Sequence, residues 1–218
     1  MNTAIASSRP TSVLLKAAMA ASGAVIALWL TLHMLGNLTV YAGPELMNGY
    51  GEKLRATGLL WPVRFGLALA VLVHVVCAVQ TTQRSWAARP QRYRTGLRHR
   101  ASTAAGRTMR ATGFLLMLFI VMHVSQMYGV VHPHFITGDI HHNLTYLMRS
   151  PWYFGVYLAA TALVSLHLAH GLRSSLTSLG VIPGKHERLV RRALYGWASI
   201  VSLGLAFSAL GPAWGWTA

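Results

Sequence analysis

The sequence predicts an all-α integral membrane protein with five membrane-spanning helices. Of its 218 residues, 54% are hydrophobic and only 11% are charged, against about a quarter charged in ordinary soluble domains. Five apolar runs are each long enough to cross a bilayer core of about 30 Å, which takes roughly 20 helical residues. All four acidic residues lie outside these runs. We therefore expect a single membrane domain over residues 1–218.

Each run has an end signal, because proline and Gly-Pro pairs start or stop helices. The signals are Gly43-Pro44 after the first run, Trp61-Pro62 before the second, His132-Pro133 after the third, Pro151 at the start of the fourth and Gly211-Pro212 after the fifth. They place the spans at about residues 17–41, 63–83, 111–131, 151–172 and 193–210. The first run is too long for the apolar part of a signal peptide, so we expect it to be retained. Trp152, Tyr153 and Tyr157 are typical of an aromatic belt.

The net charge of +15 is concentrated in two connections. The second connection carries Arg84, Arg89, Arg92, Arg94, Arg98, Arg100, Arg107 and Arg110, and the fourth carries Arg173, Lys185, Arg188, Arg191 and Arg192. By the positive-inside rule, the N-terminus and both basic connections are cytoplasmic and the C-terminus is outside. The position of the basic residues in these connections indicates that they orient the protein in the membrane rather than bind nucleic acid. A cytoplasmic partner that docks on these connections is an alternative that the charge pattern leaves open.

Five of the 11 histidines lie inside the spans: His33, His74, His123, His167 and His170. With about 1.5 Å of rise per residue, His33 lies roughly 25 Å and His123 roughly 20 Å from the inner edge of the membrane. His74 lies about 15 Å and His167 about 9 Å from that edge. The histidines therefore sort into an outer pair, His33 with His123, and an inner pair, His74 with His167. The predicted depths of His74 and His167 agree less well, and their pairing requires helix tilt or span boundaries that differ by one helical turn.

Two imidazoles that face each other across a helix bundle are typical of a b-type haem with two axial histidines, which transfers electrons. Small residues allow a macrocycle to approach the backbone, and Gly36, Gly113 and Gly171 lie near the histidines. The pattern predicts two haem b groups in a bundle of the first four spans, with the fifth span peripheral. A single intramembrane histidine could instead bond a neighbouring helix or serve a proton path. Zinc or copper is less favoured, because the one cysteine is single and no carboxylate lies nearby.

Three further residues are candidates for contacts to a haem propionate or a quinone. His170 follows His167 by three residues and could replace it as a ligand, but a contact to a propionate or a quinone is the favoured interpretation. Arg110 and Arg173 lie at the inner ends of their spans, where they could bind a propionate or simply anchor the helix.

These residues resemble the two-haem cytochrome b membrane anchor of succinate:quinone oxidoreductases, the succinate dehydrogenase and fumarate reductase family. The similar segments are residues 32–38 (LHMLGNL), 72–74 (LVH), 109–114 (MRATGF), 151–152 (PW), 167–171 (HLAHG) and 179–180 (LG). The resemblance covers roughly residues 15–212, and HLAHG is its most specific part. In the family motif the ligand precedes a glycine by four residues, which matches His167 and Gly171 and not His170.

The resemblance implies that the first and third spans ligate the outer haem, and the second and fourth the inner haem. It also implies a multi-pass protein of the bacterial cytoplasmic membrane with a flavoprotein and an iron–sulfur subunit on its cytoplasmic face. Electrons from succinate would pass through both subunits and two haems to a quinone, for which menaquinone is expected, and the complex could form higher oligomers. Some fumarate-reducing relatives carry a glutamate two residues before the fourth-span ligand. Ser165 stands there in this chain, which favours succinate oxidation.

Two other functions fit parts of the pattern. A b-type anchor of a hydrogenase or formate dehydrogenase also uses intramembrane histidines, although its pattern does not match in all four spans. A haem-free transporter or proton channel would require more polar groups along the spans. Finally, His132, His134, His141 and His142 gather with Asp139 in the third connection. We expect a solvated polar loop there, with a metal site or proton handling for a quinone as alternatives.

Overall fold

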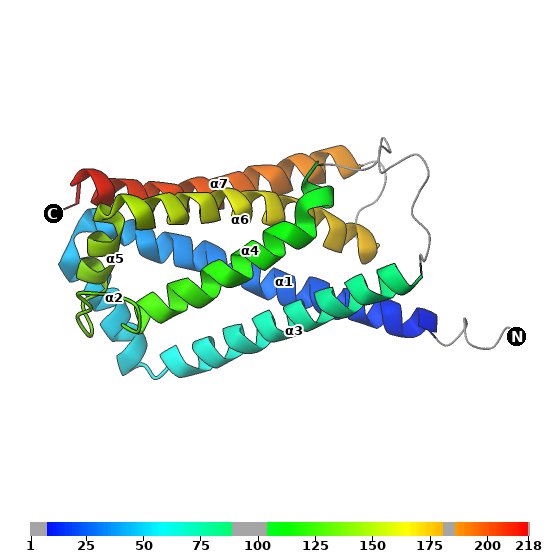
Figure 1. The fold of residues 1–218 in the computed structure, drawn as a ribbon, viewed down its shortest axis with the longest axis horizontal. Coiled ribbons are helices and arrows are strands. Elements are labelled where there is room, and N and C mark those ends of the chain that lie inside the picture. Colours follow the sequence, from blue (N-terminus) through cyan, green and yellow to red (C-terminus); the bar gives the residue numbers. More distant parts are fainter. Residues whose placement is uncertain (1–7, 89–103, 181–185, 218) are drawn as a thin grey trace, which may run out of the picture.

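The computed structural model describes residues 8–88, 104–180 and 186–217, and every regular element in these ranges is helical (Figure 1). The elements are α1 (Ser8–Leu38), the 3₁₀ helix η1 (Thr39–Ala42), α2 (Pro44–Ala56), α3 (Leu60–Ala87), α4 (Ala104–Met127), α5 (Ile140–Arg149), α6 (Pro151–Ser178) and α7 (Glu187–Trp214). Five helices are long and apolar enough to cross a membrane: α1 with η1, α3, α4, α6 and α7. The chain is a multi-pass membrane protein, and the prediction of five spans is confirmed.

The five long helices do not pack equally against one another. Helix α1 packs against α3, α6 and α7, and α6 packs against α4 and α7. Figure 1 shows α4 crossing the arrangement obliquely, while α7 lies along one edge. Helix α7, which we expected to be peripheral, also contacts α5 and carries none of the paired histidines. The helices that carry the histidines are therefore α1, α3, α4 and α6.

Several helix ends differ from the predicted ones. Helix α4 ends at Met127, before a turn in which Gly129 has a φ of +75°, rather than at residue 131. Helix α6 continues past the apolar run to Ser178, because its polar last turns still satisfy their backbone hydrogen bonds along the helix. Hydropathy therefore marks the ends of the apolar runs, which differ from the ends of the helices.

Helix α7 does not stop at Gly211-Pro212 but continues to Trp214. The Tyr41 hydroxyl accepts a hydrogen bond from Gly211 N–H at 3.0 Å and donates one to the Phe207 carbonyl at 2.5 Å. This hydroxyl thus bridges the two backbone groups of one helical turn just before Pro212. Proline and a side chain inserted into the backbone ladder are both causes of helix bending. The sequence does not reveal this contact, because Tyr41 lies 170 residues from Gly211.

Helices α2 and α5 lie together at one end of the molecule, which we call the cap end (Figure 1). The buried cluster of the structure lies here and consists of Val40, Met47, Leu144, Leu147, Met148 and Ala209. Leu144, Leu147 and Met148 recur on α5 at the spacing of one helix face. The opposite end carries Arg84, Arg110 and Arg173, and we call it the arginine end. Arg89, Arg92, Arg94, Arg98, Arg100 and Lys185 of the predicted basic connections lie outside the described residues, as does the side chain of Arg107.

The expectation of a solvated polar loop between the third and fourth spans is wrong. His132, His141 and Asn143 are buried, and residues 140–149 form α5. Asp139 caps this helix by accepting a hydrogen bond from His142 N–H at 2.9 Å, and Asn48 of α2 donates a second at 2.9 Å. These two bonds lower the pKa of the Asp139 carboxyl. Polar composition suggested exposure, whereas the polar groups bond one another and the backbone.

Candidate functional site

His33 of α1 and His123 of α4 lie side by side. Their ring centroids are 5.8 Å apart, with 80° between the ring planes. Each imidazole is stacked on an aromatic ring one helical turn before it, Trp29 beside His33 at 4.6 Å and Phe119 beside His123 at 5.7 Å. The outer pair is therefore enclosed by aromatic side chains.

A chain of hydrogen bonds holds the His123 ring. The Tyr157 hydroxyl lies 2.9 Å from His123 Nδ1 and donates to Gln126 Oε1 at 2.8 Å. Because its proton is used in the bond to Gln126, the hydroxyl oxygen accepts from Nδ1–H, which leaves the lone pair of His123 on Nε2. Gln126 is fully buried. The sequence pattern places Tyr157 in an aromatic belt and assigns no role to Gln126, although a lone amide near the end of an apolar run is a signal of such a contact.

His74 of α3 and His167 of α6 form a second pair, with ring centroids 6.4 Å apart and 65° between the planes. His74 Nδ1 lies 3.0 Å from the Met19 carbonyl, to which it donates. His167 Nδ1 lies 3.2 Å from Thr112 Oγ1. The Thr112 hydroxyl donates to the Met109 carbonyl at 3.0 Å, so its oxygen accepts from His167. The lone pair of each imidazole is again left on Nε2.

Two glycines allow the inner histidines to lie close to the neighbouring helices. A Cβ at Gly23 of α1 would lie 3.0 Å from His74 Cε1, and one at Gly113 of α4 would lie 3.1 Å from His167 Cε1. Of the three glycines that we expected near the histidines, only Gly113 has this role. Gly36 faces the Tyr50 ring and Gly171 faces the Met109 methyl group. Gly23 was missed, because it lies on a helix whose own histidine belongs to the other pair.

The lengths of α3 and α6 account for the inner pair, whose predicted depths differed by about 6 Å. Helix α3 continues 13 residues beyond His74 to Ala87, and α6 continues 11 residues beyond His167 to Ser178. Measured along the axes from these helix ends, the two histidines lie about 20 and about 17 Å away, so these distances differ less than the predicted depths do. The mismatch came from predicted spans that ended too early.

The ring separation of each pair can be compared with that of two imidazoles on one metal ion. With metal–nitrogen bonds of about 2 Å on each side, the ring centroids of two axial imidazoles lie roughly 6 Å apart. The observed separations are 5.8 and 6.4 Å. Ligating histidines donate their other nitrogen to a carbonyl or a similar acceptor, as His74, His123 and His167 do here. In the described ranges, no group of three or more His, Cys, Asp or Glu side chains could hold a metal ion by itself.

The other candidate residues lie toward the arginine end. Arg110 donates to Ser85 Oγ at 3.0 Å and its guanidinium lies 5.4 Å from the centroid of the Trp86 ring, so it ties α4 to α3. Arg173 forms a 3.0 Å ion pair with Glu187, the first residue of α7. His170 and Arg173 also line a cavity of about 200 Å³ together with Ser174, Thr177 and Ser178. This cavity is open to an anionic or hydrogen-bonding group.

Comparison with protein-family models, with curated proteins and with solved structures finds no match to this chain. The functional argument therefore depends on the histidine geometry and on the sequence motifs themselves.

Proposed function

We propose that this chain is the two-haem cytochrome b membrane anchor of a succinate:quinone oxidoreductase. The observation that carries the proposal is the existence of two histidine pairs at two depths. One pair joins α1 to α4 and the other joins α3 to α6, each at the separation of two axial ligands. His33 and His123 would hold the outer haem, and His74 and His167 the inner haem. When bound, the two haem b groups supply one-electron carriers in the apolar part of the membrane.

The residues around the pairs have defined tasks in this proposal. Tyr157, the Met19 carbonyl and Thr112 fix the orientation of three of the four imidazoles and keep the proton on Nδ1. The aromatic rings beside the outer pair exclude water from it. His170 and Arg173 line the cavity nearest the cytoplasmic side and would contact a propionate or a quinone.

The orientation and the partners belong to the same proposal. The arginine end would face the cytoplasm, where a flavoprotein and an iron–sulfur subunit would dock, and the cap end would face outside. The five long helices carry a single carboxylate, Glu187, which is ion-paired to Arg173 at the arginine end. A proton path built from carboxylates across the membrane has no support in these helices. This favours succinate oxidation in a bacterial cytoplasmic membrane, with menaquinone as the expected acceptor.

The deciding experiment is a dithionite-reduced minus oxidised spectrum of the purified protein, with a measured haem-to-protein ratio. We expect b-type bands and a ratio near two. Absence of haem would overturn the proposal in favour of a transporter or channel. Co-purification with a hydrogenase or formate dehydrogenase subunit, in place of a succinate-oxidising flavoprotein, would assign the anchor to another respiratory enzyme.

A further inference from the structure

A cavity of about 590 Å³ opens at the cap end, and none of the four paired histidines lines it. Four segments build it: the end of α2, the start of α3, the end of α4 and the loop that precedes α5. Its wall includes Arg55, Leu60, Trp61, Arg64, Tyr128 and Thr137. The cavity thus combines two cations with aromatic rings at the end of the membrane-spanning helices.

Aromatic rings hold Arg64 at this cavity. Its guanidinium carbon lies 5.4 Å from the centroid of the Trp61 ring and 5.1 Å from that of the Tyr128 ring. Trp61 precedes Arg64 by one helical turn, whereas Tyr128 follows the end of α4. Cation–π contacts of this kind orient a guanidinium but leave its N–H groups available for an anion.

Arg55 reaches the same cavity from α2. A Cβ at Gly138 would lie 3.7 Å from its Nη1, so the guanidinium lies against the loop that closes the cavity. Two carboxylates lie near Arg55 in sequence or in the adjoining loop. Glu52 precedes it by three residues on α2 and forms no ion pair with it, and Asp139 is engaged by Asn48 and by the backbone of His142. Across the described residues, the ion pair between Arg173 and Glu187 is the only one. Neither guanidinium group at the cavity is therefore ion-paired with a carboxylate of the described residues.

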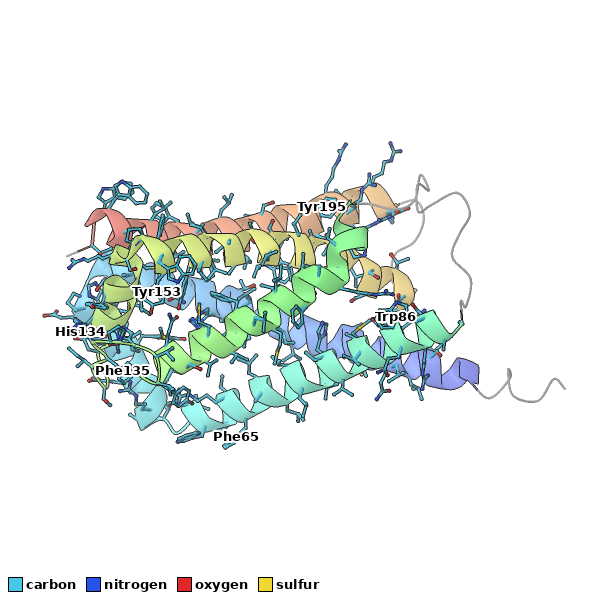
Figure 2. The ribbon with its side chains drawn as sticks, viewed as in Figure 1. Phe65, Trp86, His134, Phe135, Tyr153 and Tyr195 are labelled. Carbon is cyan, nitrogen blue, oxygen red and sulfur yellow. The ribbon has the colours of Figure 1, made fainter. Side chains whose placement is uncertain are left out.

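We propose that this cavity binds the phosphate of an anionic phospholipid. Two guanidinium groups supply N–H donors for the several acceptor oxygens of a phosphodiester, and their positive charge favours a lipid whose net charge is negative. The carbonyls of a quinone do not require two cations. The apolar side chains next to the cavity fit acyl chains: Phe65 and Leu69 of α3 are exposed, and Figure 2 shows Phe65 pointing away from the bundle. Arginines that only extend to the membrane surface are not expected to line one cavity from two different helices.

Native mass spectrometry of the full chain, stripped of lipid in detergent, tests the proposal. The probes are dihexanoyl phosphatidylglycerol and the zwitterionic dihexanoyl phosphatidylcholine. We expect one phosphatidylglycerol to bind at least about tenfold more tightly than phosphatidylcholine. The double variant Arg55→Gln/Arg64→Gln should abolish this preference. Arg149→Gln, which removes an exposed arginine of α5 outside the cavity wall, should preserve it. Equal binding of both lipids, or equal loss in the Arg149 variant, would overturn the proposal.

A second substitution tests the site without removing either arginine. Thr137 is exposed in the cavity wall, so Thr137→Glu should place a negative charge beside the phosphate and weaken phosphatidylglycerol binding by about tenfold. Glutamine has nearly the same size as glutamate without its charge, so Thr137→Gln should bind phosphatidylglycerol as the parent protein does.

Two further probes distinguish other ligands. Inorganic phosphate that binds as tightly as phosphatidylglycerol would identify a free-phosphate site instead. A short-chain menaquinone analogue that displaces phosphatidylglycerol and binds equally well to the double arginine variant would identify a quinone site; either result overturns the lipid assignment.

Discussion

The two histidine pairs have similar ring separations, 5.8 and 6.4 Å, but different surroundings. Aromatic rings from Trp29, Phe119 and Tyr157 enclose the outer pair. The inner pair lies against Gly23 and Gly113, with a main-chain carbonyl and a threonine hydroxyl as its hydrogen-bond acceptors. The outer pair is thus positioned by side chains, and the inner pair largely by close approach of backbones. Steric overlap from an added side chain should therefore perturb the inner pair, whereas loss of a hydroxyl can perturb either pair.

The largest effect is expected from removal of a paired histidine. Alanine in place of His33 or His123 should abolish one haem, and alanine in place of His74 or His167 should abolish the other, because an iron that loses an axial ligand is no longer held on both sides. The haem-to-protein ratio and redox titration of the reduced spectrum measure this. His134→Ala, at the exposed cap end, should retain both haems. Loss of the same haem on replacement of His33 and of His74 would show that the pairing is wrong.

The next effect tests the close approach at the inner pair. Gly113→Val should push a side chain into His167, whose Cε1 lies 3.1 Å from the new Cβ. Overpacking of this kind costs about 1–3 kcal/mol, so we expect loss of the inner haem and retention of the outer one. The haem-to-protein ratio and thermal unfolding in detergent report the two consequences.

Gly66→Val is the matched control for this substitution. A Cβ at Gly66 of α3 meets no atom within 4 Å, so the variant makes the same chemical change in a long helix without the collision. Both haems should be retained. If Gly66→Val and Gly113→Val lost the inner haem equally, valine in a helix would be the cause and the comparison between the pairs would fail.

A smaller effect is expected from removal of one hydroxyl. In Tyr157→Phe, His123 Nδ1–H loses its acceptor and Gln126 loses its donor. A hydrogen bond from Nδ1–H makes the imidazole a more basic ligand, and a more basic ligand favours ferric iron. Its loss should raise the midpoint potential of the outer haem by on the order of tens of millivolts, with about 60 mV for each tenfold change in relative affinity. Redox potentiometry should show no shift of the inner haem.

Thr112→Val is the reciprocal variant, because Thr112 accepts from His167. It should raise the potential of the inner haem and leave the outer one unchanged. Equal shifts of both haems in either variant would indicate a general loosening of the bundle rather than local hydrogen bonding.

The sequence predicted the parts of this structure that depend on periodicity and polarity along one helix. The number of spans follows from apolar runs that lipid requires, and the depths of His33 and His123 follow from the rise of the helix. Contacts between distant segments were not predictable in this way. Tyr41 bridges the last turns of α7, Tyr157 bonds His123, and Gly23 makes room for His74; each depends on how helices rotate and cross, which hydropathy does not record.

The cap end shows the other limit. Its histidines, asparagine and aspartate suggested a solvated loop, because polar composition does not distinguish exposed groups from groups that bond one another. Only the spacing of Leu144, Leu147 and Met148 indicated a short amphipathic helix. That spacing covers little more than one helical turn and is a weak signal between two long apolar runs.

The smallest predicted effect concerns this cap and tests whether it is independent of the inner pair. Asp139→Ala should cost about 1 kcal/mol of stability, because α5 loses its N-cap. The pKa of Asp139 is lowered in the folded chain from its ordinary 3.8. Its contribution is therefore present above about pH 4 and is lost as the pH falls through the lower folded value. Thermal unfolding of parent and variant should converge below that pH. Asp139→Asn keeps a good N-cap and removes the titrating carboxyl, so the difference in stability between this variant and the parent should not follow the pH dependence seen with Asp139→Ala.

The same two variants test whether the cap end is coupled to the inner pair. The inner pair lies on the far side of the outer pair from the cap end, so both variants should leave the midpoint potential of the inner haem unchanged. A shift of that potential would show that the cap end and the inner pair are coupled.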